Sequence, residues 1–281
     1  MGEFRRVPAM EDPYEYVERC PWKIACEPFR VAPHVWYVSG NTWVGAYLID
    51  TGDGLILIDT FEVRALYLLT EAVRKAGFDP GEIKLILLSH GHADHCGGLK
   101  ALQEMTKAKV YMSKEDYEVK KTHFDRVFFR PDGQDFEPDG FYSDQKTIEL
   151  GTIRIRTKLC PGHTPGTTSF FFWDEDGEGK RYLCGMHGGA GTGFLSDEYL
   201  DDYGYPRWFR QRFVDDCKEM ASWPVDICLA SHPNMTNFLS GVNWEDPSDY
   251  QGFVDRGAWR NFMLERAEDA ERLGRGETRA R

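Results

Sequence analysis

The segment Leu85–Gly98 reads LILLSHGHADHCGG and places three of the chain's eight histidines within six positions. The apolar run that opens it is typical of a strand covered on both faces. His90 and His92 are two residues apart, so on extended backbone their side chains lie on one face. Asp94 and His95 follow where the chain turns into a helix. We therefore expect these four side chains to converge at the carboxyl edge of a sheet, where α/β proteins place their sites.

Two further histidines stand directly after predicted strands. His163 lies in CPGHTPG after the strand expected at 152–159, and His232 lies in LASHPN after the strand expected at 225–231. Imidazole and carboxylate groups are ligands suited to zinc. The spacing differs from the helical H-E-x-x-H pattern, so it does not indicate a helical protease site. The whole set predicts a metal centre built at strand ends.

Strand-like and helix-like segments alternate around these histidines. Their order along the chain indicates an α/β protein with two similar halves in one domain, at 31–281, after an N-terminal extension at 1–30. Runs of β-branched and aromatic residues predict strands at 35–40, 44–52, 53–60, 83–89, 108–112, 146–150, 152–159, 168–173, 181–186 and 225–231. Apolar residues at helical spacing and capping signals predict helices at 63–77, 95–107, 113–121, 207–222 and about 250–274.

The charge balance limits the kinds of partner. Thirty-four basic residues stand against 46 acidic ones, which gives a net charge of −12. An acidic surface repels phosphate backbones and so disfavours nucleic acid as a partner. No apolar run approaches the length needed to cross a bilayer, so no membrane association is predicted. We expect a small-molecule substrate, and the oligomeric state is left open.

The N-terminus and the cysteines bear on the compartment. The stretch MGEFRRVPAMEDPYEYVERC has no apolar block after its basic residues, so it does not read as a signal peptide. The seven cysteines form no C-x-x-C pair, and they fit a reducing compartment. We expect a cytoplasmic protein, or a periplasmic or secreted one if a leader has been removed.

The histidine motifs resemble those of the metallo-β-lactamase superfamily. The motifs are H-x-H-x-D-H after an apolar strand, then GHTPGTTSF, then the tract from YPRWFRQRF to SHPNMTNF. The resemblance extends from VWYVSGNTWVGAYLIDTGDGLILIDT to the last helix, and it points to the third subclass of class B β-lactamases. It implies an αββα sandwich of the metallo-β-lactamase type. It also implies one zinc ion held by His90, His92 and His163 and a second held by Asp94, His95 and His232.

The chemistry that this resemblance implies is hydrolysis at two zinc ions, with other divalent metals as alternatives. Two zinc ions would share a water and lower its pKa from about 15.7 toward 7, so that the hydroxide opens a cyclic amide such as a β-lactam. Asp94 would orient this hydroxide. One alternative is an intracellular lactone or thioester hydrolase of the same fold. Another is a non-hydrolytic di-metal redox protein, which usually needs an additional electron-carrying domain.

The segment after the predicted strand at 181–186 differs from the lactamases of this subclass. Where those enzymes carry serines that contact the carboxylate of the drug, this chain has Met186, His187, Gly188 and Gly189. We expect His187 to be a catalytic or substrate-binding residue near the metals; the alternative is that it only hydrogen-bonds its own loop. Gly189 is expected to face the substrate.

The segment 122–143 has no clear period. It is expected to be a flap or pocket wall, or a loop packed on its own side chains. Its aromatic residues predict an apolar wall for a ring-bearing substrate, with Phe124, Phe128, Phe129 and Phe136 as the contacts.

We expect four residues near the histidines to support the site without binding metal. Cys96 is expected to pack under a helix rather than to act as a nucleophile. Ser89, Thr164 and Thr167 are expected to fix the tautomers of the histidines.

Overall fold

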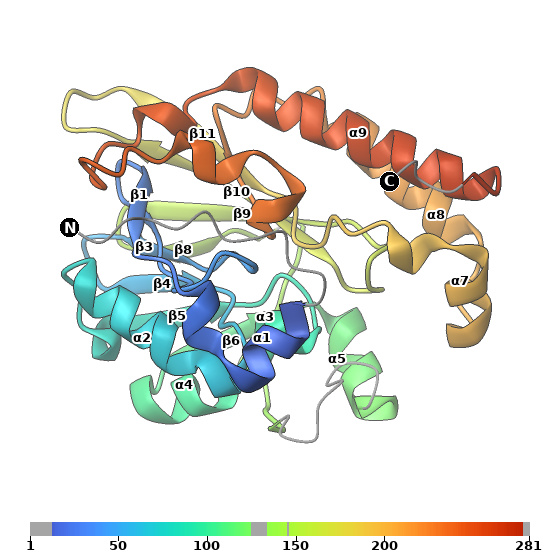
Figure 1. The fold of residues 1–281 in the computed structure, drawn as a ribbon, viewed down its shortest axis with the longest axis horizontal. Helices are drawn as coiled ribbons and strands as arrows, with labels where there is room; N and C mark the ends of the chain where they lie inside the picture. Colours follow the sequence, from blue (N-terminus) through green and yellow to red (C-terminus); the bar gives the residue numbers. More distant parts are fainter. Residues whose placement is uncertain (1–12, 125–133, 145, 278–281) are drawn as a thin grey trace.

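Two β-sheets pack face to face, and helices cover the outer face of each sheet (Figure 1). The structure, a computed structural model, describes residues 13–124, 134–144 and 146–277. The layers follow in the order helix, sheet, sheet, helix. This is the αββα sandwich that the family resemblance implies.

The first sheet contains the strand that precedes the histidine cluster. Its strands, in spatial order, are β1 (Phe29–Ala32), β2 (Val35–Tyr37), β3 (Tyr47–Asp50), β4 (Leu55–Ile58), β5 (Ile83–Leu87), β6 (Lys109–Met112) and β7 (Gly140–Phe141). The first four pair antiparallel, and those from β4 to β7 run parallel. The parallel arrangement brings the carboxyl ends of β4, β5 and β6 to one edge. β1 and β7 were not predicted, because segments of four and two residues are too short to show a period.

The second sheet supplies the other two predicted ligands. Its strands are β8 (Ile148–Leu150), β9 (Ile153–Leu159), β10 (Thr168–Glu175), β11 (Arg181–Met186) and β12 (Ile227–Leu229), in the spatial order β12-β11-β10-β9-β8. β12 runs parallel to β11, and the other pairs are antiparallel. His163 follows β9, and His232 follows β12.

The helices fall into two outer layers, with short helices near the site. They are α1 (Pro13–Arg19), α2 (Leu66–Lys75), α3 (Ala93–Cys96), α4 (Leu99–Thr106), α5 (Lys114–Thr122), α7 (Asp197–Tyr203), α8 (Trp208–Met220) and α9 (Arg256–Gly274). α2 and α4 pack on the first sheet, and α8 and α9 pack on the second. The helix predicted at 95–107 is in two pieces, because the N–H of Gly98 donates to the Phe61 carbonyl at 2.7 Å instead of continuing the helix.

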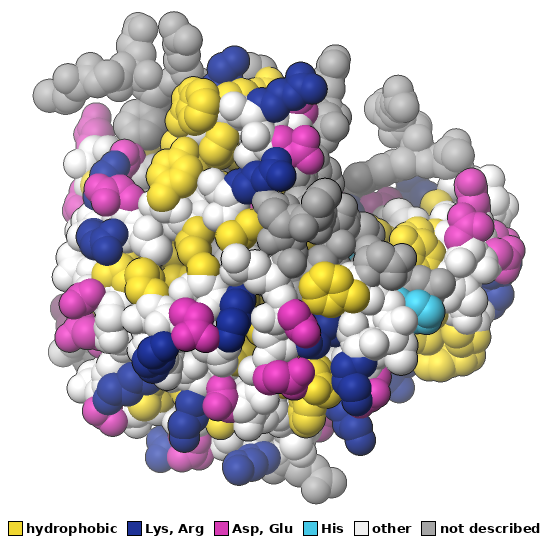
Figure 2. All heavy atoms as spheres, turned by 90° about the horizontal axis from the view of Figure 1, so that it is seen from below, with side chains coloured by type: hydrophobic (Ala, Val, Ile, Leu, Met, Phe, Trp, Pro, Cys, Tyr) yellow, Lys and Arg dark blue, Asp and Glu magenta, His cyan; other side chains and the backbone are white. Residues whose placement is uncertain are grey.

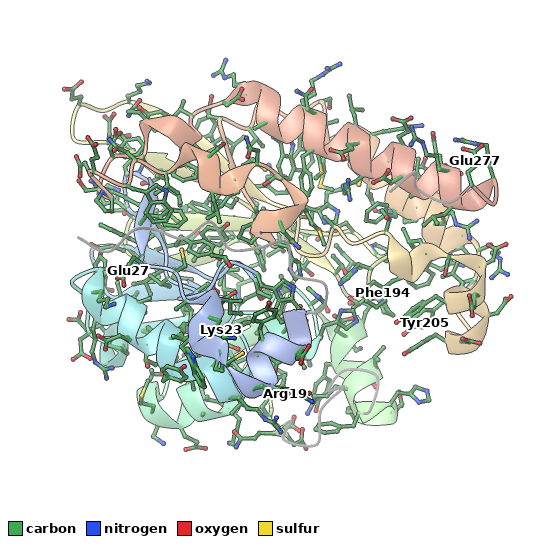
Figure 3. The ribbon with its side chains drawn as sticks, viewed as in Figure 1. Arg19, Lys23, Glu27, Phe194, Tyr205 and Glu277 are labelled. Carbon is green, nitrogen blue, oxygen red and sulfur yellow. The ribbon has the colours of Figure 1, made fainter. Side chains whose placement is uncertain are left out.

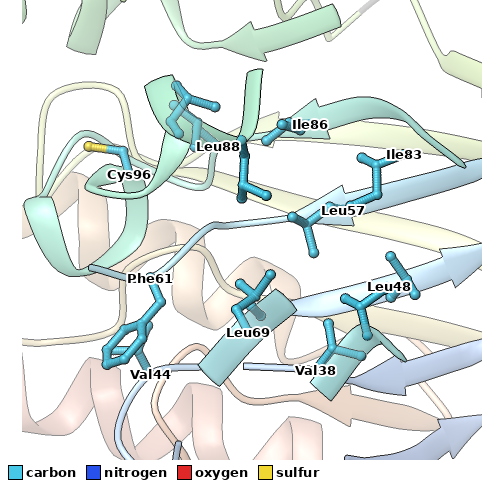
Figure 4. Close-up of a cluster of buried hydrophobic side chains, with 14 of the residues drawn as sticks. Val38, Val44, Leu48, Leu57, Phe61, Leu69, Ile83, Ile86, Leu88 and Cys96 are labelled. Carbon is cyan, nitrogen blue, oxygen red and sulfur yellow. The ribbon is translucent and has the colours of Figure 1, made fainter. Parts of the chain in front are cut away.

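Three apolar clusters hold the layers together. One lies between α2, α4 and the first sheet, and Figure 4 shows part of it around Leu57, Leu69 and Ile86. A second fills the space between the sheets, and a third lies between the second sheet and α8 and α9. Each fully buried aliphatic side chain contributes about 1.5–3 kcal/mol to folding. The sheet edge with the histidines therefore rests on packed layers.

The described part of the predicted N-terminal extension packs on this core. Val17 of α1 and Ile24 are at most 1% exposed, and both belong to the cluster under α2. Ala25 forms an isolated bridge with Asn41. The domain boundary at residue 30 stays a prediction, although residues before it contribute to the core.

The surface carries charges of both signs. On the face seen from below, where α4 and α5 lie, acidic and basic side chains are interspersed (Figure 2). Within the described ranges, no helix combines the length and the apolar character that crossing a membrane requires.

Candidate metal centre

Four predicted ligands follow β5 at the carboxyl edge of the first sheet. His90 and His92 lie on the extended segment after the strand, and Asp94 and His95 lie in the single turn of α3. All four side chains are buried, at 0–5% exposure. The sequence prediction that they converge is therefore confirmed, because the extended segment leads directly into the helical turn.

The ligands form two overlapping groups of atoms. The ligand atoms of His90, His92 and His163 lie within 4.8 Å of one another, and so do those of His90, Asp94 and His95. His92 Nδ1 is 3.0 Å from His163 Nε2. His90 belongs to both groups, so the two groups are adjacent.

His232 completes the second group from the opposite sheet. Its Nε2 lies 3.1 Å from His95 Nε2 and 3.5 Å from Asp94 Oδ2. Asp94 Oδ2 is in turn 3.6 Å from His95 Nε2. The structure thus brings together all six residues that the sequence predicts as metal ligands.

The donor set fits metal ions better than hydrogen bonding alone. His90 Nε2 is buried without a hydrogen-bond partner among the described residues. Two pairs of imidazole nitrogens face each other at 3.0 and 3.1 Å. Such clusters are costly in a protein interior unless a cation satisfies the nitrogens. The residues present therefore fit a divalent metal centre with nitrogen and oxygen ligands.

The second group is held by a residue that sequence analysis missed. Asp59, at the end of β4, has a left-handed backbone with φ of 61° and a fully buried side chain. Its Oδ2 is 2.8 Å from His95 Nδ1 and accepts the Ser89 hydroxyl at 2.7 Å, while its Oδ1 accepts the Ser89 N–H at 2.8 Å. The only sequence signal was a single acid at the end of the apolar run LILID. Ser89 in turn contacts His90 Nδ1 at 3.0 Å, as predicted.

Backbone carbonyls orient two other ligands. His163 Nδ1 is 3.0 Å from the Gly191 carbonyl, and His232 Nδ1 is 3.0 Å from the Trp43 carbonyl. In each ring this contact places the proton on Nδ1 and leaves Nε2 as the lone-pair donor toward the centre. The hydrogen-bond pattern thus selects the tautomer that binds metal.

The environment keeps most of these rings neutral. Burial lowers the pKa of four histidines below the usual 6.5, and the neighbouring histidines lower it further: His90, His92, His163 (to about 4) and His232. In His95, burial also acts to lower the pKa, but Asp94 and Asp59 outweigh it and the pKa is raised. Neutral imidazole is the form that binds metal.

Comparison with known proteins identifies the family. Residues 44–183 match the family model described as the metallo-beta-lactamase superfamily. The crystal structure of the metallo-β-lactamase GOB-18 from Elizabethkingia meningoseptica is 26% identical, with a TM-score of 0.79, and the match covers 95% of this chain and 97% of that one. The chain belongs to the metallo-β-lactamase superfamily. Native FEZ-1 from Legionella gormanii is 27% identical, with a TM-score of 0.78 and coverage of 90% and 97%.

Other similar proteins differ in the activity that their names state. Two class B3 metallo-β-lactamases share the fold. A hydroxyacylglutathione hydrolase from a Shewanella species is 24% identical over 146 residues, which are 50% of this chain and 45% of that protein. The chain covers 35 to 64% of the length of the first curated relatives that it matches. Family and relatives together support a zinc-dependent hydrolase.

The loop after β11 packs against the ring of the predicted metal ligand His163. A Cβ on Gly189 would lie 2.6 Å from Cδ2 of His163, and a Cβ on Gly191 would lie 3.1 Å from Cε1 of the same ring. Gly189, which the sequence predicted to face substrate, therefore packs against a ligand ring. Any side chain at this position would displace His163.

His187 is directed into the protein. It is 1% exposed; its Nδ1 accepts the Gly189 N–H at 3.2 Å, and its Nε2 lies 3.9 Å from Cys217 Sγ on α8. It is in neither group of metal-binding atoms. Burial, with His163 and Arg266 adding to it, lowers the pKa of His187 to about 3, so the neutral ring prevails near neutral pH. These contacts fit the alternative in which His187 hydrogen-bonds its own loop, and a part in turnover stays a prediction.

An aromatic wall beside the ligands comes from a segment whose aromatics the sequence analysis had not singled out. Phe194, in the 3₁₀ turn η4 (Gly193–Leu195), has its ring centroid 4.9 Å from that of His92 and 4.4 Å from that of His163. Tyr199 of α7 packs on Phe194 at 4.9 Å. Figure 3 shows Phe194 and Tyr205 on this side of the molecule. The signal available was the density of aromatic residues between 194 and 209.

The aromatic residues of 122–143 that were predicted to form a substrate wall do not lie together in the described part of the chain. Phe124 follows α5 and is 37% exposed. Phe136 is 2% exposed within the core cluster under the first sheet, so its assignment to a substrate wall was wrong. Phe128 and Phe129 lie outside the described residues.

Two other predictions about supporting residues have clear outcomes. Cys96 is buried, its thiol donates to the Gly91 carbonyl at 3.3 Å, and burial raises its pKa well above the usual value. Its packing role is confirmed. Thr164 and Thr167 contact each other at 2.9 Å, and Thr164 donates to Asp116 rather than to a histidine.

Proposed function

We propose that this protein is a di-zinc hydrolase that opens the cyclic amide of a β-lactam. The observation that carries this proposal is the pair of overlapping ligand groups, buried and drawn from both sheets. Similarity to GOB-18 and FEZ-1 over at least 90% of each chain supports β-lactams as the substrate class.

In this proposal the six ligands form two zinc sites with three ligands each. His90, His92 and His163 hold the first zinc, and Asp94, His95 and His232 hold the second. Bound zinc supplies a Lewis acid and an activated water at neutral pH. The buried rings stay neutral and fixed by their outer hydrogen bonds, so the ligands do not have to reorganise when substrate arrives.

Two side chains at the centre have distinct parts. Asp94 is the one carboxylate among the six ligands, and it offsets positive charge and orients the attacking water. Phe194 covers the rings of His92 and His163 and excludes bulk water from that side. Cys96 does not act as the nucleophile, because its raised pKa keeps its thiol protonated.

A lactone or thioester substrate is the second candidate. In the described part of the chain, no Lys or Arg lines the small cavity beside His92 and His163. A neutral ester or thioester needs no cationic partner there, whereas the carboxylate of a β-lactam drug gains from one. Similarity to a hydroxyacylglutathione hydrolase also favours this candidate.

Steady-state turnover of the zinc-loaded protein tests the proposal. The panel contains penicillins, cephalosporins and carbapenems beside aliphatic lactones and acyl thioesters. We expect β-lactam hydrolysis, and we expect Asp94→Asn to lower it by about a hundredfold or more, since even outer-shell changes cost about 10–100-fold. Asp174→Asn, at another buried carboxylate on the far end of β10, is the matched control. Two bound zinc ions with turnover only of lactones or thioesters would transfer the assignment to the second candidate.

A further inference from the structure

Asp116 is a buried carboxylate beside the metal centre that belongs to neither ligand group. It lies in the first turn of α5 and is 1% exposed. It lines the same small cavity as His92 and His163. A buried carboxylate at this position is close enough to affect the residues around the metal centre.

Asp116 receives three hydrogen bonds, and all three come from the two loops that carry the first ligand group. Its Oδ2 accepts the N–H of Gly91 at 2.8 Å, and Gly91 is the residue between His90 and His92. The same oxygen accepts the hydroxyl of Thr164 at 2.9 Å. Its Oδ1 accepts the N–H of Gly166 at 2.6 Å. One carboxylate thus joins the loop after β5 to the loop after β9, across the two sheets.

The start of α5 packs closely against the loop after β9 and holds the Asp116 carboxylate next to it. Ser113 caps the helix, with its Oγ accepting the N–H of Asp116 at 3.2 Å. A Cβ on Gly166 would lie 2.0 Å from Ser113 Oγ and 2.6 Å from the Asp116 carboxyl carbon. Only glycine allows this approach, so the GHTPG motif requires its second glycine for contact with α5.

We propose that Asp116 is the positioning residue of the first metal site, fixing the loop of His90 and His92 relative to the loop of His163. This inference rests on the proposed di-zinc centre. The second site has its own buried carboxylate in Asp59, which contacts His95. Each site is therefore oriented by a different acidic side chain from the first-sheet half of the molecule.

The arrangement requires a carboxylate and no other group of similar size. Three donors converge on two oxygens, and an amide at this position offers one oxygen and a donating nitrogen. In either amide orientation the nitrogen would face at least one N–H or O–H donor, and the loops would separate. Burial raises the pKa of Asp116 to about 6, against the lowering effect of these hydrogen bonds, so the carboxylate is still the main form at neutral pH.

Zinc affinity measured by chelator competition near neutral pH tests the proposal. We expect Asp116→Asn to weaken one of the two zinc equivalents by about 10–100-fold, the usual effect of an outer-shell partner, and to leave the other unchanged. In a His232→Ala background only the first group is complete. There the same substitution should weaken binding of the remaining zinc ion by the same factor as in the otherwise wild-type protein. Asp174→Asn is the matched control, because Asp174 is also 1% exposed and accepts a backbone N–H, from His34 at 2.8 Å.

Thr164→Val is the second variant, in case Asp116→Asn does not fold. It removes one of the three donors, and we expect a weaker effect, of a few fold, on the same zinc equivalent. If the wild type binds two zinc ions and both variants bind them with unchanged affinities, the assignment of Asp116 is wrong while the di-zinc proposal stands. If both equivalents weaken alike, Asp116 supports the fold rather than the first site, and the assignment is also wrong. A wild type that binds no zinc overturns both proposals.

Discussion

At the scale of single residues, His187 links pH to stability without contacting a metal-binding atom in either group. Its folded-state pKa of about 3 lies below the usual 6.5, so the ring stays neutral in the fold but gains a proton in the unfolded chain below about pH 6.5. Stability is therefore lost as the pH falls from about 6.5 toward 3. Between about pH 7 and pH 5 this one ring costs about 2 kcal/mol.

We expect His187→Asn to reduce the difference in the free energy of unfolding between about pH 7 and pH 5 by about 2 kcal/mol. The asparagine oxygen can still accept the Gly189 N–H. Urea unfolding of the zinc-loaded protein at the two pH values measures the difference. His123→Asn is the control, because His123 is exposed after α5. An unchanged difference in His187→Asn would mean that the ring is protonated or exposed in the fold.

The candidate metal ligands were predictable, and the residues that support them largely were not. The six ligands carry a spacing that depends only on the local strand and turn. Asp59 and Asp116 act across the fold. Asp59 contacts a ligand histidine 36 positions away in sequence, and Asp116 contacts residues at least 25 positions away. A single sequence records no such pairing, so in the sequence Asp59 is only an acid at a strand end and Asp116 only an acid in the first turn of a helix.

At the scale of elements, the glycine loop after β11 sets the position of a ligand from the second sheet. A Cβ at Gly189 would lie 2.6 Å from Cδ2 of His163, which is closer than carbon atoms pack. We expect Gly189→Ala to shift the ring and weaken the first zinc by about 1–3 kcal/mol, roughly five- to 150-fold in affinity. Chelator competition measures the loss.

Gly193→Ala provides the control for this loop. A Cβ there meets no atom within 4 Å, and the residue lies only four positions further along the chain. Zinc affinity should stay at the wild-type value. A loss as large in Gly193→Ala as in Gly189→Ala would show that the loop responds to any added methyl group, and the argument from the His163 contact would fail.

Among elements, long periodic segments were predictable and short ones were not. The predicted strands 83–89 and 181–186 and the helix at 207–222 correspond to β5, β11 and α8. The sequence predicts no helix at α7 or η4, because seven and three residues give too little periodicity to recognise. These short elements place Phe194 and Tyr199, so the aromatic wall was missed along with them.

At the scale of the whole molecule, the metal centre joins the two sheets. His90, His92, Asp94 and His95 come from the first sheet, and His163 and His232 come from the second. The α/β class with two similar halves was predictable because buried strands and amphipathic helices alternate along the chain, whereas the αββα order followed from the family resemblance. Which loops would meet across the sandwich followed from the family resemblance and not from periodicity.

Because the ligands span both sheets, removing zinc should destabilise the fold as a whole. Zinc at about one hundred times its Kd stabilises the native state by about 2.7 kcal/mol per site, so we expect chelation to lower the unfolding free energy by at least that amount. On acidification both forms should lose stability together, since four ligand histidines have lowered pKa values and the unfolded chain, which is common to both forms, binds protons that the folded rings do not. The stabilisation by zinc should shrink rather than grow, because His95, with its raised pKa, takes up a proton in the metal-free fold that competes with the metal. Urea unfolding with and without chelator between about pH 5 and 7 measures both effects. Equal stability of the two forms across this range would mean that the six side chains bind no zinc tightly, and that the sheets are held by their apolar layers alone.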